Sequence, residues 1–152
     1  MSDGMVIRRA ERDDVPAIEK CIEESYAKYI ARIGKKPMPM MEDYCEVIRH
    51  ATVYVLKCGD NLAGVLVLID REEYVLLETI AVYPNFRGKS FGKKLLQFTE
   101  KYTKEQGKNE IRLYTNEKMH ENISLYNHCG YIEYKREEEA GFHRVYFKKI
   151  LT

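Results

Sequence analysis

A short stretch in the middle of the chain has the residue types and spacing that bind an anion. It reads Arg87-Gly88-Lys89-Ser90-Phe91-Gly92 and follows an apolar run that ends at Val82. From Phe91 onward, apolar side chains recur at helical spacing, so the stretch is predicted to open a helix. Backbone N–H groups at a small-residue helix start, together with the helix dipole, favour a phosphate. A basic helix start that holds no ligand is the alternative interpretation.

Two kinds of phosphate-binding loop share features with this stretch. Gly88-Lys89-Ser90 matches the end of the nucleoside-triphosphate loop, G-x-x-x-x-G-K-[ST]. That loop needs its first glycine at position 83, where the chain has Tyr83. Without this glycine the backbone cannot wrap around a triphosphate, so the sequence argues against the nucleotide loop. The pattern that remains is Arg-x-x-small-x-Gly, with Arg87, Ser90 and Gly92 at the defining positions.

The composition limits the classes of protein to consider. The chain has 152 residues, 45% of them hydrophobic, which predicts a single domain over 1–152 with a substantial core. A net charge of +1 gives no bulk field for nucleic acid or for an anionic membrane. The four cysteines show neither a C-x-x-C pair nor metal-like spacing, which predicts reduced thiols in the cytoplasm and no metal. No apolar run resembles a signal peptide or a membrane span.

The hydrophobic patterns in the first half of the chain predict two helices and four strands. A strand over 5–10 precedes a helix that begins near Asp13 and ends at Gly34, a residue type that terminates helices. Residues 35–41 contain two prolines, which predicts a stiff loop without regular structure. A short helix is expected over 42–50. Strands are expected over 52–57, 62–69 and 74–82, with a turn at Gly59-Asp60-Asn61 between the first two.

The second half of the chain is predicted to continue with helices alternating with strands. A helix from about 88 to 107 and a strand over 110–115 form a right-handed crossover, which implies a parallel pair with the strand over 74–82. A short helix over 121–129 is closed by Gly130. The strands 131–134 and 142–149 form a final hairpin, with the charged residues 135–139 in its turn.

Element order and motifs together resemble the GNAT superfamily of N-acetyltransferases over essentially the whole chain. The first motif is the Arg-x-x-small-x-Gly loop, and the second is Asn122-x-x-x-Tyr126 followed by Gly130-Tyr131. The chain departs from the usual form at Ser90, where glycine is common. It also departs at Asn122, because the commoner asparagine stands seven residues before the tyrosine, where this chain has Met119.

The resemblance implies the fold class and the cosubstrate. The fold is α/β (α+β), with a mixed, mostly antiparallel sheet of six to seven strands, about four flanking helices and central strands that splay apart. The cosubstrate is acetyl-CoA, without a metal. Its pantetheine arm adds like a strand to the backbone of Ile80-Ala81-Val82. The resemblance places the phosphates of acetyl-CoA on the loop, where the expected contacts are Arg87, Gly88, Lys89, Ser90, Phe91 and Gly92. It places the pantetheine arm beside the second motif, where the expected contacts are Asn122 and Tyr126.

Acetyl transfer to an amine needs a base, an oxyanion donor and help for the leaving thiolate. The resemblance assigns the oxyanion to the N–H of Val82. By strand alternation Glu78 shares a face with Ile80 and Val82, so it is the candidate general base; the alternatives are a surface ion pair for Glu78, or a base at His120 or His128. Tyr126 is the candidate hydrogen-bond or proton donor to sulfur, and its alternative is a core tyrosine.

The acceptor is expected to be the amine of a small molecule, an amino acid or a peptide. The segment from Tyr29 to Tyr44 looks like a loop that borders the acceptor side in small family members. Arg32 is the candidate for gripping a carboxylate, and Met40 and Tyr44 are candidates for an apolar wall. The alternative for this segment is a loop that covers the core. A non-catalytic acetyl-CoA sensor is the alternative function, and the sequence leaves a homodimer open.

Overall fold

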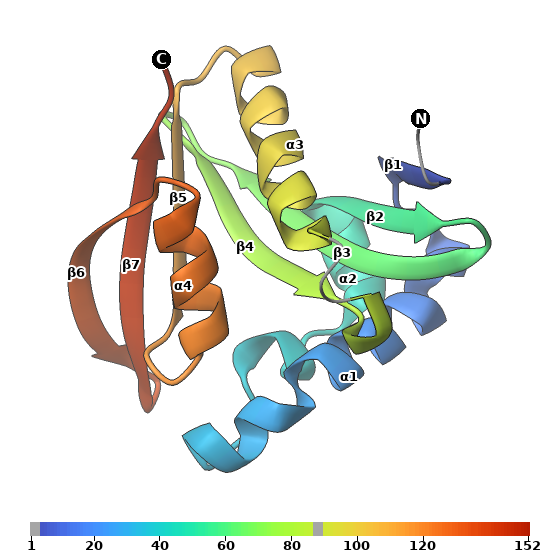
Figure 1. Ribbon diagram of the computed structural model, residues 1–152, viewed down its shortest axis with the longest axis horizontal. Coiled ribbons are helices and arrows are strands. Elements are labelled where there is room, and N and C mark those ends of the chain that lie inside the picture. The colour runs from blue at the N-terminus through green and yellow to red at the C-terminus, as the bar shows by residue number, and fades with distance from the viewer. Residues whose placement is uncertain (1–3, 87–89) are drawn as a thin grey trace.

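The computed structural model describes residues 4–86 and 90–152 and contains one mixed sheet (Figure 1). Its seven strands follow the order β1-β2-β3-β4-β5-β7-β6, and only the β4–β5 pair is parallel. The fold class and the parallel crossover predicted from the sequence are thereby confirmed. The strands are β1 Met5–Arg9, β2 Thr52–Cys58, β3 Asn61–Asp70, β4 Val75–Val82, β5 Glu110–Asn116, β6 Ile132–Glu139 and β7 Phe142–Ile150.

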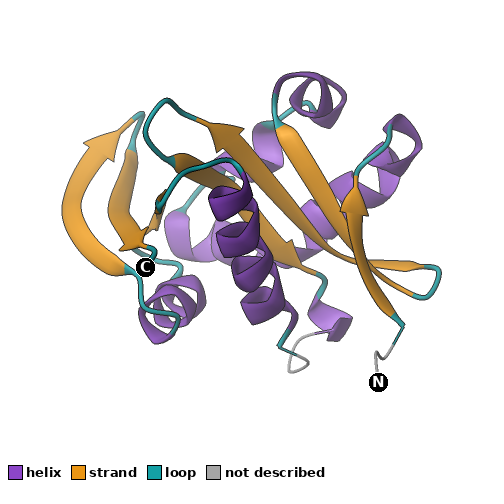
Figure 2. Ribbon diagram, turned by 90° about the horizontal axis from the view of Figure 1, so that it is seen from above, coloured by secondary structure: helices purple, strands orange, loops and turns teal. Residues whose placement is uncertain are grey.

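Helices cover both faces of the sheet (Figure 2). They are α1 Val15–Ile33, α2 Tyr44–His50, α3 Phe91–Glu105 and α4 His120–His128, with 3-10 turns at Arg12–Asp14, Met38–Met41 and Pro84–Phe86. In α1 the buried residues Val15, Ile18, Ile22, Tyr26 and Tyr29 recur at three and four positions and make the stripe that contacts the sheet. The helix ends where Gly34 takes the left-handed conformation, with φ at 90°.

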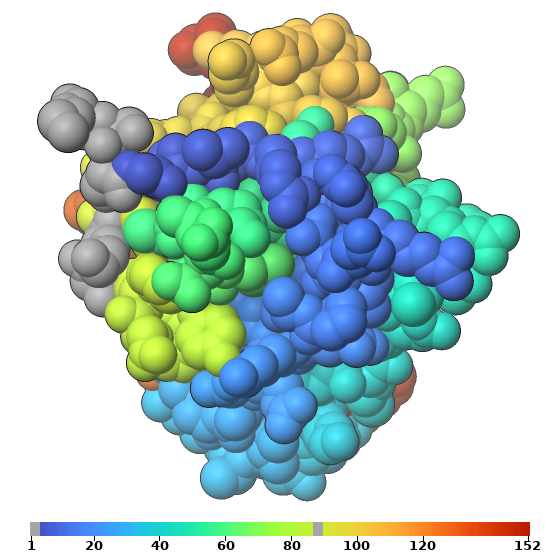
Figure 3. Space-filling view, turned by 90° about the vertical axis from the view of Figure 1, so that its right-hand side faces the viewer, coloured from blue at the N-terminus to red at the C-terminus, as the bar shows by residue number. Residues whose placement is uncertain are grey.

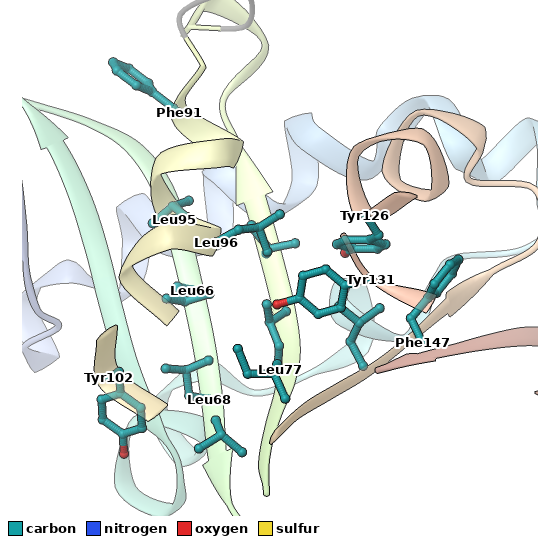
Figure 4. Close-up of a cluster of buried hydrophobic side chains, with 14 of the residues drawn as sticks. Leu66, Leu68, Leu77, Phe91, Leu95, Leu96, Tyr102, Tyr126, Tyr131 and Phe147 are labelled. Atoms are coloured by element: carbon teal, nitrogen blue, oxygen red, sulfur yellow. The ribbon is translucent and has the colours of Figure 1, made fainter. Parts of the chain in front are cut away.

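Two hydrophobic clusters fill the space between the sheet and its helices. One contains α3 and α4 side chains packed on β3, β4, β5 and β7; Figure 4 shows Leu95 and Leu96 of α3 beside Leu66 and Leu77. The other joins α1 and Tyr44 of α2 to the opposite face. Figure 3 shows the outer side of the N-terminal half, where β1 and the β2–β3 hairpin lie together. The sheet is therefore buried on both faces at its centre.

The two central strands separate part-way along their length (Figure 1). The parallel pairing of β4 with β5 covers only Val75–Leu77 against Ile111–Leu113. Beyond Leu77, β4 runs on to Val82 and remains paired with β3 alone. This divergence is the splay that the resemblance implied, and it leaves one edge of β4 without a neighbouring strand.

Three sequence expectations need correction. The segment with two prolines forms a 3-10 turn over Met38–Met41, a short structure that accepts proline in its first turn. The charged residues 135–139 belong to β6, because an edge strand with both faces exposed can carry charges throughout, and the turn falls at Ala140-Gly141. Finally, α3 begins at Phe91 and ends at Glu105, which is shorter than the predicted span 88–107.

Candidate active site

The open edge of β4 presents main-chain groups of Ile80 and Val82. The N–H of Tyr83 donates to the Ala63 carbonyl of β3 at 2.7 Å. Because successive residues of a strand direct their main-chain groups to opposite edges, those of Ile80 and Val82 point away from β3. Helix α1 confirms this direction: Tyr26 Oη donates to the Ile80 carbonyl and Ser25 Oγ donates to the Val82 carbonyl, both at 2.8 Å. The N–H of Val82 therefore faces the splay.

A β-bulge at Glu78 changes which way this carboxylate points. Thr79 pairs with Val67 and Leu77 pairs with Leu68, so Glu78 is the extra residue on β4. Such a bulge breaks the alternation of side chains. As a result Leu77 and Ile80, three residues apart, pack in the same cluster under α3. The expectation that Glu78 shares a face with Ile80 and Val82 is wrong, because alternation holds only in a regular strand.

Two clefts meet at the splay. The β4–β5 cleft lies between the separated strands and is walled by the 37–39 segment, Glu42, Glu78 and Tyr126. The α3–α4 cleft runs from the start of α3 along Ile80–Val82 to α4. Tyr26, Ile80 and Asn122 line both clefts. The arrangement gives two chambers that share one junction beside the open edge of β4.

Burial tunes the carboxylate in the β4–β5 cleft. Glu78 is half-buried, and desolvation raises the pKa of its carboxyl above the ordinary value of 4.5. The negative charge of Glu42 raises this pKa further, and Arg71 opposes the shift. A carboxylate with raised proton affinity that lines a cleft is suited to accept a proton from a bound group.

Tyr126 lines the same cleft from α4. The residue is only 3% exposed, and its ring lies 5.7 Å from Phe147 and 5.9 Å from Tyr131, centroid to centroid (Figure 4). Burial raises the pKa of the phenol, so its hydroxyl keeps its proton and stays a hydrogen-bond donor. One helical turn earlier, Asn122 lies at the junction of the two clefts, with Nδ2 3.8 Å from Met119 Sδ.

The start of α3 forms one end of the α3–α4 cleft. Ser90 caps the helix in the left-handed conformation, with φ at 61°, and Phe91 beneath it is buried. This backbone conformation favours glycine, which explains the glycine of the usual motif. Gly92 lines the cleft, and a Cβ there would lie 3.1 Å from Leu125 Cδ2. Arg87, Gly88 and Lys89 fall outside the described residues.

The three expected acceptor residues occupy other positions. Arg32 forms a two-pronged ion pair with Glu121, at 2.7 and 2.9 Å, and joins α1 to α4 outside the residues that line the β4–β5 cleft. Tyr44 is buried and its hydroxyl donates to the Pro39 carbonyl. Met40 packs against the α1 cluster. The segment itself does wall the cleft, but through Pro37, Met38 and Pro39 together with Glu42.

Sequence reasoning missed several residues of the site. Ser25 and Tyr26 contribute two hydrogen bonds to β4, yet in the sequence they belong only to the stripe of an amphipathic helix. Tyr114, Asn116 and Arg144 enter the cleft from β5 and β7, and no motif marks them. The two alternative bases separate: His128 borders the α3–α4 cleft, whereas His120 lines neither. The one signal available for Ser25 and Tyr26 was the presence of hydroxyl groups on a buried helix face.

The described residues form neither a cluster of metal ligands nor a membrane-spanning helix. Within residues 4–86 and 90–152, no group of three or more histidine, cysteine, aspartate or glutamate side chains gathers as a metal-ion site requires. Across the same ranges, no helix combines the length and the apolar character needed to cross a membrane.

The profile of the acetyltransferase (GNAT) family matches residues 18–131. The chain therefore belongs to the GNAT family and is an acyltransferase of the acetyl-CoA-dependent class. Comparison with curated protein sequences returned no match.

Solved structures share this fold over almost the whole chain. The PaiA N-acetyltransferase of Thermoplasma acidophilum, in complex with coenzyme A, is 20% identical with a TM-score of 0.81, covering 99% of each chain. An acetyltransferase of Streptococcus agalactiae is 17% identical with a TM-score of 0.82, covering 99% of this chain and 100% of its own. The ribosomal-protein-S18-alanine N-acetyltransferase of Escherichia coli is 16% identical with a TM-score of 0.74, covering 97% and 94%.

Proposed function

We propose that the protein transfers the acetyl group of acetyl-CoA to a primary amine of a small molecule, amino acid or peptide by direct attack. The observation that carries this proposal is the junction at which the two clefts meet beside the open edge of β4. One cleft joins the start of α3 to the open edge of β4, which suits a phosphorylated arm. The other is lined by a half-buried carboxylate, Glu78, which suits an amine.

The reaction balances without a metal or a redox partner. The amine nitrogen forms a bond to the acetyl carbon, and the bond from that carbon to sulfur breaks. A protonated amine loses two protons in the overall reaction, of which one ends on the CoA thiol and one leaves to solvent. Acetyl-CoA supplies the activated acetyl group, and the protein supplies the groups that position it and move protons.

Glu78 is the proposed base. An aliphatic amine has a pKa near ~10.4 and is mostly protonated at neutral pH, so a group beside it must take a proton. The raised pKa of Glu78 strengthens this carboxylate as an acceptor, and its place in the wall of the β4–β5 cleft supports the role. The bulge supports it as well, since bulges often re-aim a side chain beside an active site.

The N–H of Val82 is the proposed donor to the thioester oxygen. It belongs to the strand edge that faces the splay, and a donor fixed in advance costs no reorganisation when charge develops. The backbone of Ile80 and Ala81 completes this wall of the α3–α4 cleft, and Asn122 faces it from α4. Tyr126 is the proposed hydrogen-bond donor to the departing sulfur.

The helix start is the proposed phosphate site. Ser90, Phe91 and Gly92 line the α3–α4 cleft, where α3 directs its first N–H groups, and Lys93 adds a positive charge. The absence of a side chain at Gly92 keeps this end of the cleft open. Arg87, Gly88 and Lys89 complete the proposed loop by sequence. The proposal includes a cytoplasmic location, as the reduced cysteines predict.

A thiol-release assay tests the function. Purified protein is mixed with acetyl-CoA and a panel of amines, amino acids and peptides, and free CoA thiol is measured against time. We expect release that depends on both the amine and the protein, with the N-acetylated product confirmed by mass spectrometry. Binding of acetyl-CoA without turnover of any amine would instead support the non-catalytic sensor.

A further inference from the structure

The charges that line the β4–β5 cleft are mostly negative. Among the described residues that line it, the charged side chains are Glu42, Glu78 and Arg144. Glu42 is exposed to solvent, whereas Glu78 is half-buried. Both carboxylates line the same cleft, so one ligand lying along it can meet both negative charges.

The cation of this cleft already has a partner. Arg144 is only 9% exposed, and its Nη1 lies 2.8 Å from Glu139 Oε2. Its guanidinium also lies 4.4 Å from the centre of the Tyr114 ring. This ion pair and the ring contact already balance part of the Arg144 charge, which weakens its attraction for a ligand carboxylate. The Nζ atom of Lys35 lies 4.1 Å from the centre of the Phe142 ring, and Lys35 does not line the cleft.

The remaining walls suit a cation that carries an aliphatic chain. Tyr26, Tyr114, Tyr126 and Phe142 line the cleft with aromatic rings, and Pro37, Met38, Pro39 and Ile33 line it with apolar groups. Aromatic faces attract ammonium groups, and apolar walls accept methylene groups. An ammonium at Glu42 and an amine at Glu78 would occupy both carboxylates and leave the methylenes between them.

We infer that the acceptor is a linear aliphatic diamine or polyamine, with its reacting nitrogen at Glu78 and a second, charged nitrogen at Glu42. The inference rests on the proposed function and narrows its substrate class. Glu42 is placed against the second nitrogen and not against the reacting one, so it is a specificity residue, and the acetyl transfer itself proceeds as described above.

Three substrates that share a four-carbon chain isolate the second charge. These are 1,4-diaminobutane, butylamine, which lacks the second nitrogen, and 4-aminobutyrate, which replaces it with a carboxylate. We expect kcat/KM to be at least about tenfold higher for the diamine than for butylamine, because a charged hydrogen bond is lost, and lowest for 4-aminobutyrate. Equal values for the diamine and butylamine, or a preference for 4-aminobutyrate, would overturn the inference.

Glu42→Gln locates the preference. In this variant the KM for the diamine should rise about tenfold and the KM for butylamine should stay within twofold. The preference for the diamine over butylamine should therefore largely disappear. Glu105→Gln is the matched control, since this exposed carboxylate lies at the far end of α3 and lines neither cleft. A ratio unchanged by Glu42→Gln, or reduced equally by Glu105→Gln, would contradict the placement.

A binding measurement separates this inference from the proposed function. Calorimetric titration of 1,4-diaminobutane into the protein saturated with CoA, which cannot donate an acetyl group, reports binding without chemistry. We expect binding that weakens about tenfold in Glu42→Gln. Diamine binding that weakens in Glu42→Gln, without acetylation of any amine, would contradict the proposed function and support the placement of the second nitrogen at Glu42. Acetylation of other amines without diamine binding would support the proposed function and contradict the inference.

Discussion

At the scale of single residues, burial gives the two candidate catalytic groups their character. Glu78 and Tyr126 line the same cleft, and desolvation raises the pKa of both. For the carboxylate, a raised pKa means a stronger base. For the phenol, it means a hydroxyl that stays protonated and donates hydrogen bonds. Each role can be tested by an isosteric substitution that leaves packing almost unchanged.

Tyr126→Phe removes the hydroxyl and keeps the ring between Tyr131 and Phe147. We expect kcat to fall by ~10- to 1,000-fold, the range from one stabilising hydrogen bond to acid assistance. The Kd for CoA should change by less than about threefold, or roughly 0.6 kcal/mol, because the interaction matters only as charge builds on sulfur. Steady-state kinetics and calorimetry measure both. A kcat within twofold, with chemistry rate-limiting, would make Tyr126 a packing residue.

Glu78→Gln removes the proposed base, and we expect kcat to fall by ~10²- to 10⁴-fold. In the wild type, kcat/KM should fall as the pH drops through the raised pKa of Glu78, since only the ionised form accepts a proton. Glu42→Gln should move this limb to lower pH, because the negative neighbour raises that pKa. Plots of kcat/KM against pH measure this effect. If the decrease at low pH persists in Glu78→Gln, then a group other than Glu78 is responsible for it.

Stability provides the control for Glu78→Gln. Because the pKa of Glu78 is higher in the folded state than in the unfolded state, the native state binds more protons between these two pKa values. The free energy of unfolding therefore falls as the pH rises from the lower to the higher pKa. The ionised Glu78 is therefore a destabilising feature at neutral pH. Glu78→Gln should show a Tm equal to or above that of the wild type at pH 7, and a lower Tm would point to structural damage instead.

Residue positions in the site could be predicted where the backbone or a motif of the resemblance carries the function. The strand pattern predicted a strand through Ile80 and Val82, and the family resemblance supplied their role, which depends on main-chain groups and not on side chains. The direction of Glu78 did not follow, since a bulge depends on the register against β3. Arg32 did not follow either, because its partner Glu121 lies 89 residues away in the sequence.

At the scale of elements, the start of α3 carries a conformational cost. Ser90 is left-handed, as is Ala140 in the β6–β7 turn, and both are non-glycine residues. The sequence predicted a helix start here, but the backbone conformation of Ser90 depends on how the strand β4 delivers the chain to α3. The order of the elements was predictable because each hydrophobic period was clear. The ends of α3 and the extent of β6 were not, since charged residues fit turns and exposed edge strands equally well.

Ser90→Gly should relieve this cost. We expect the free energy of unfolding to increase by up to about 1 kcal/mol, because glycine adopts the left-handed conformation freely but gains entropy when unfolded. Ala140→Gly is the matched control, with a φ of 54° and no place in either cleft. Both variants should resist urea better, and only Ser90→Gly should also change the Kd for CoA. A loss of stability in Ser90→Gly alone would contradict the assigned backbone conformation.

At the scale of the whole molecule, the described strands form one sheet that opens where β4 and β5 part. Strands β1 to β3 and helix α1 hold one side of the opening, and β5 to β7 with α4 hold the other. The ion pair of Arg32 with Glu121 and the further pair of Lys28 with Glu121, at 3.0 Å, connect the two sides through α1 and α4. A ligand that fills the opening must therefore stabilise the entire fold.

CoA at a hundredfold excess over its Kd should stabilise the native state by about 2.7 kcal/mol and raise the Tm by roughly 5–10 °C. ATP at the same concentration should not, because the chain lacks the glycine of the nucleotide loop. Differential scanning calorimetry measures both shifts. Gly92→Glu places a carboxylate in the α3–α4 cleft and should abolish the shift with CoA. An equal shift with ATP would contradict the assignment of this cleft.

Amide hydrogen exchange at β4 tests the central claim, that the open edge of this strand receives the cosubstrate. The N–H of Val82 faces the splay, whereas that of Ala81 faces β3 and is an internal control. On saturation with acetyl-CoA, exchange at Val82 should slow by at least about tenfold, as expected for a new hydrogen bond, and exchange at Ala81 should change far less. Saturation that leaves Val82 unaltered, or that protects both amides equally, would contradict the account.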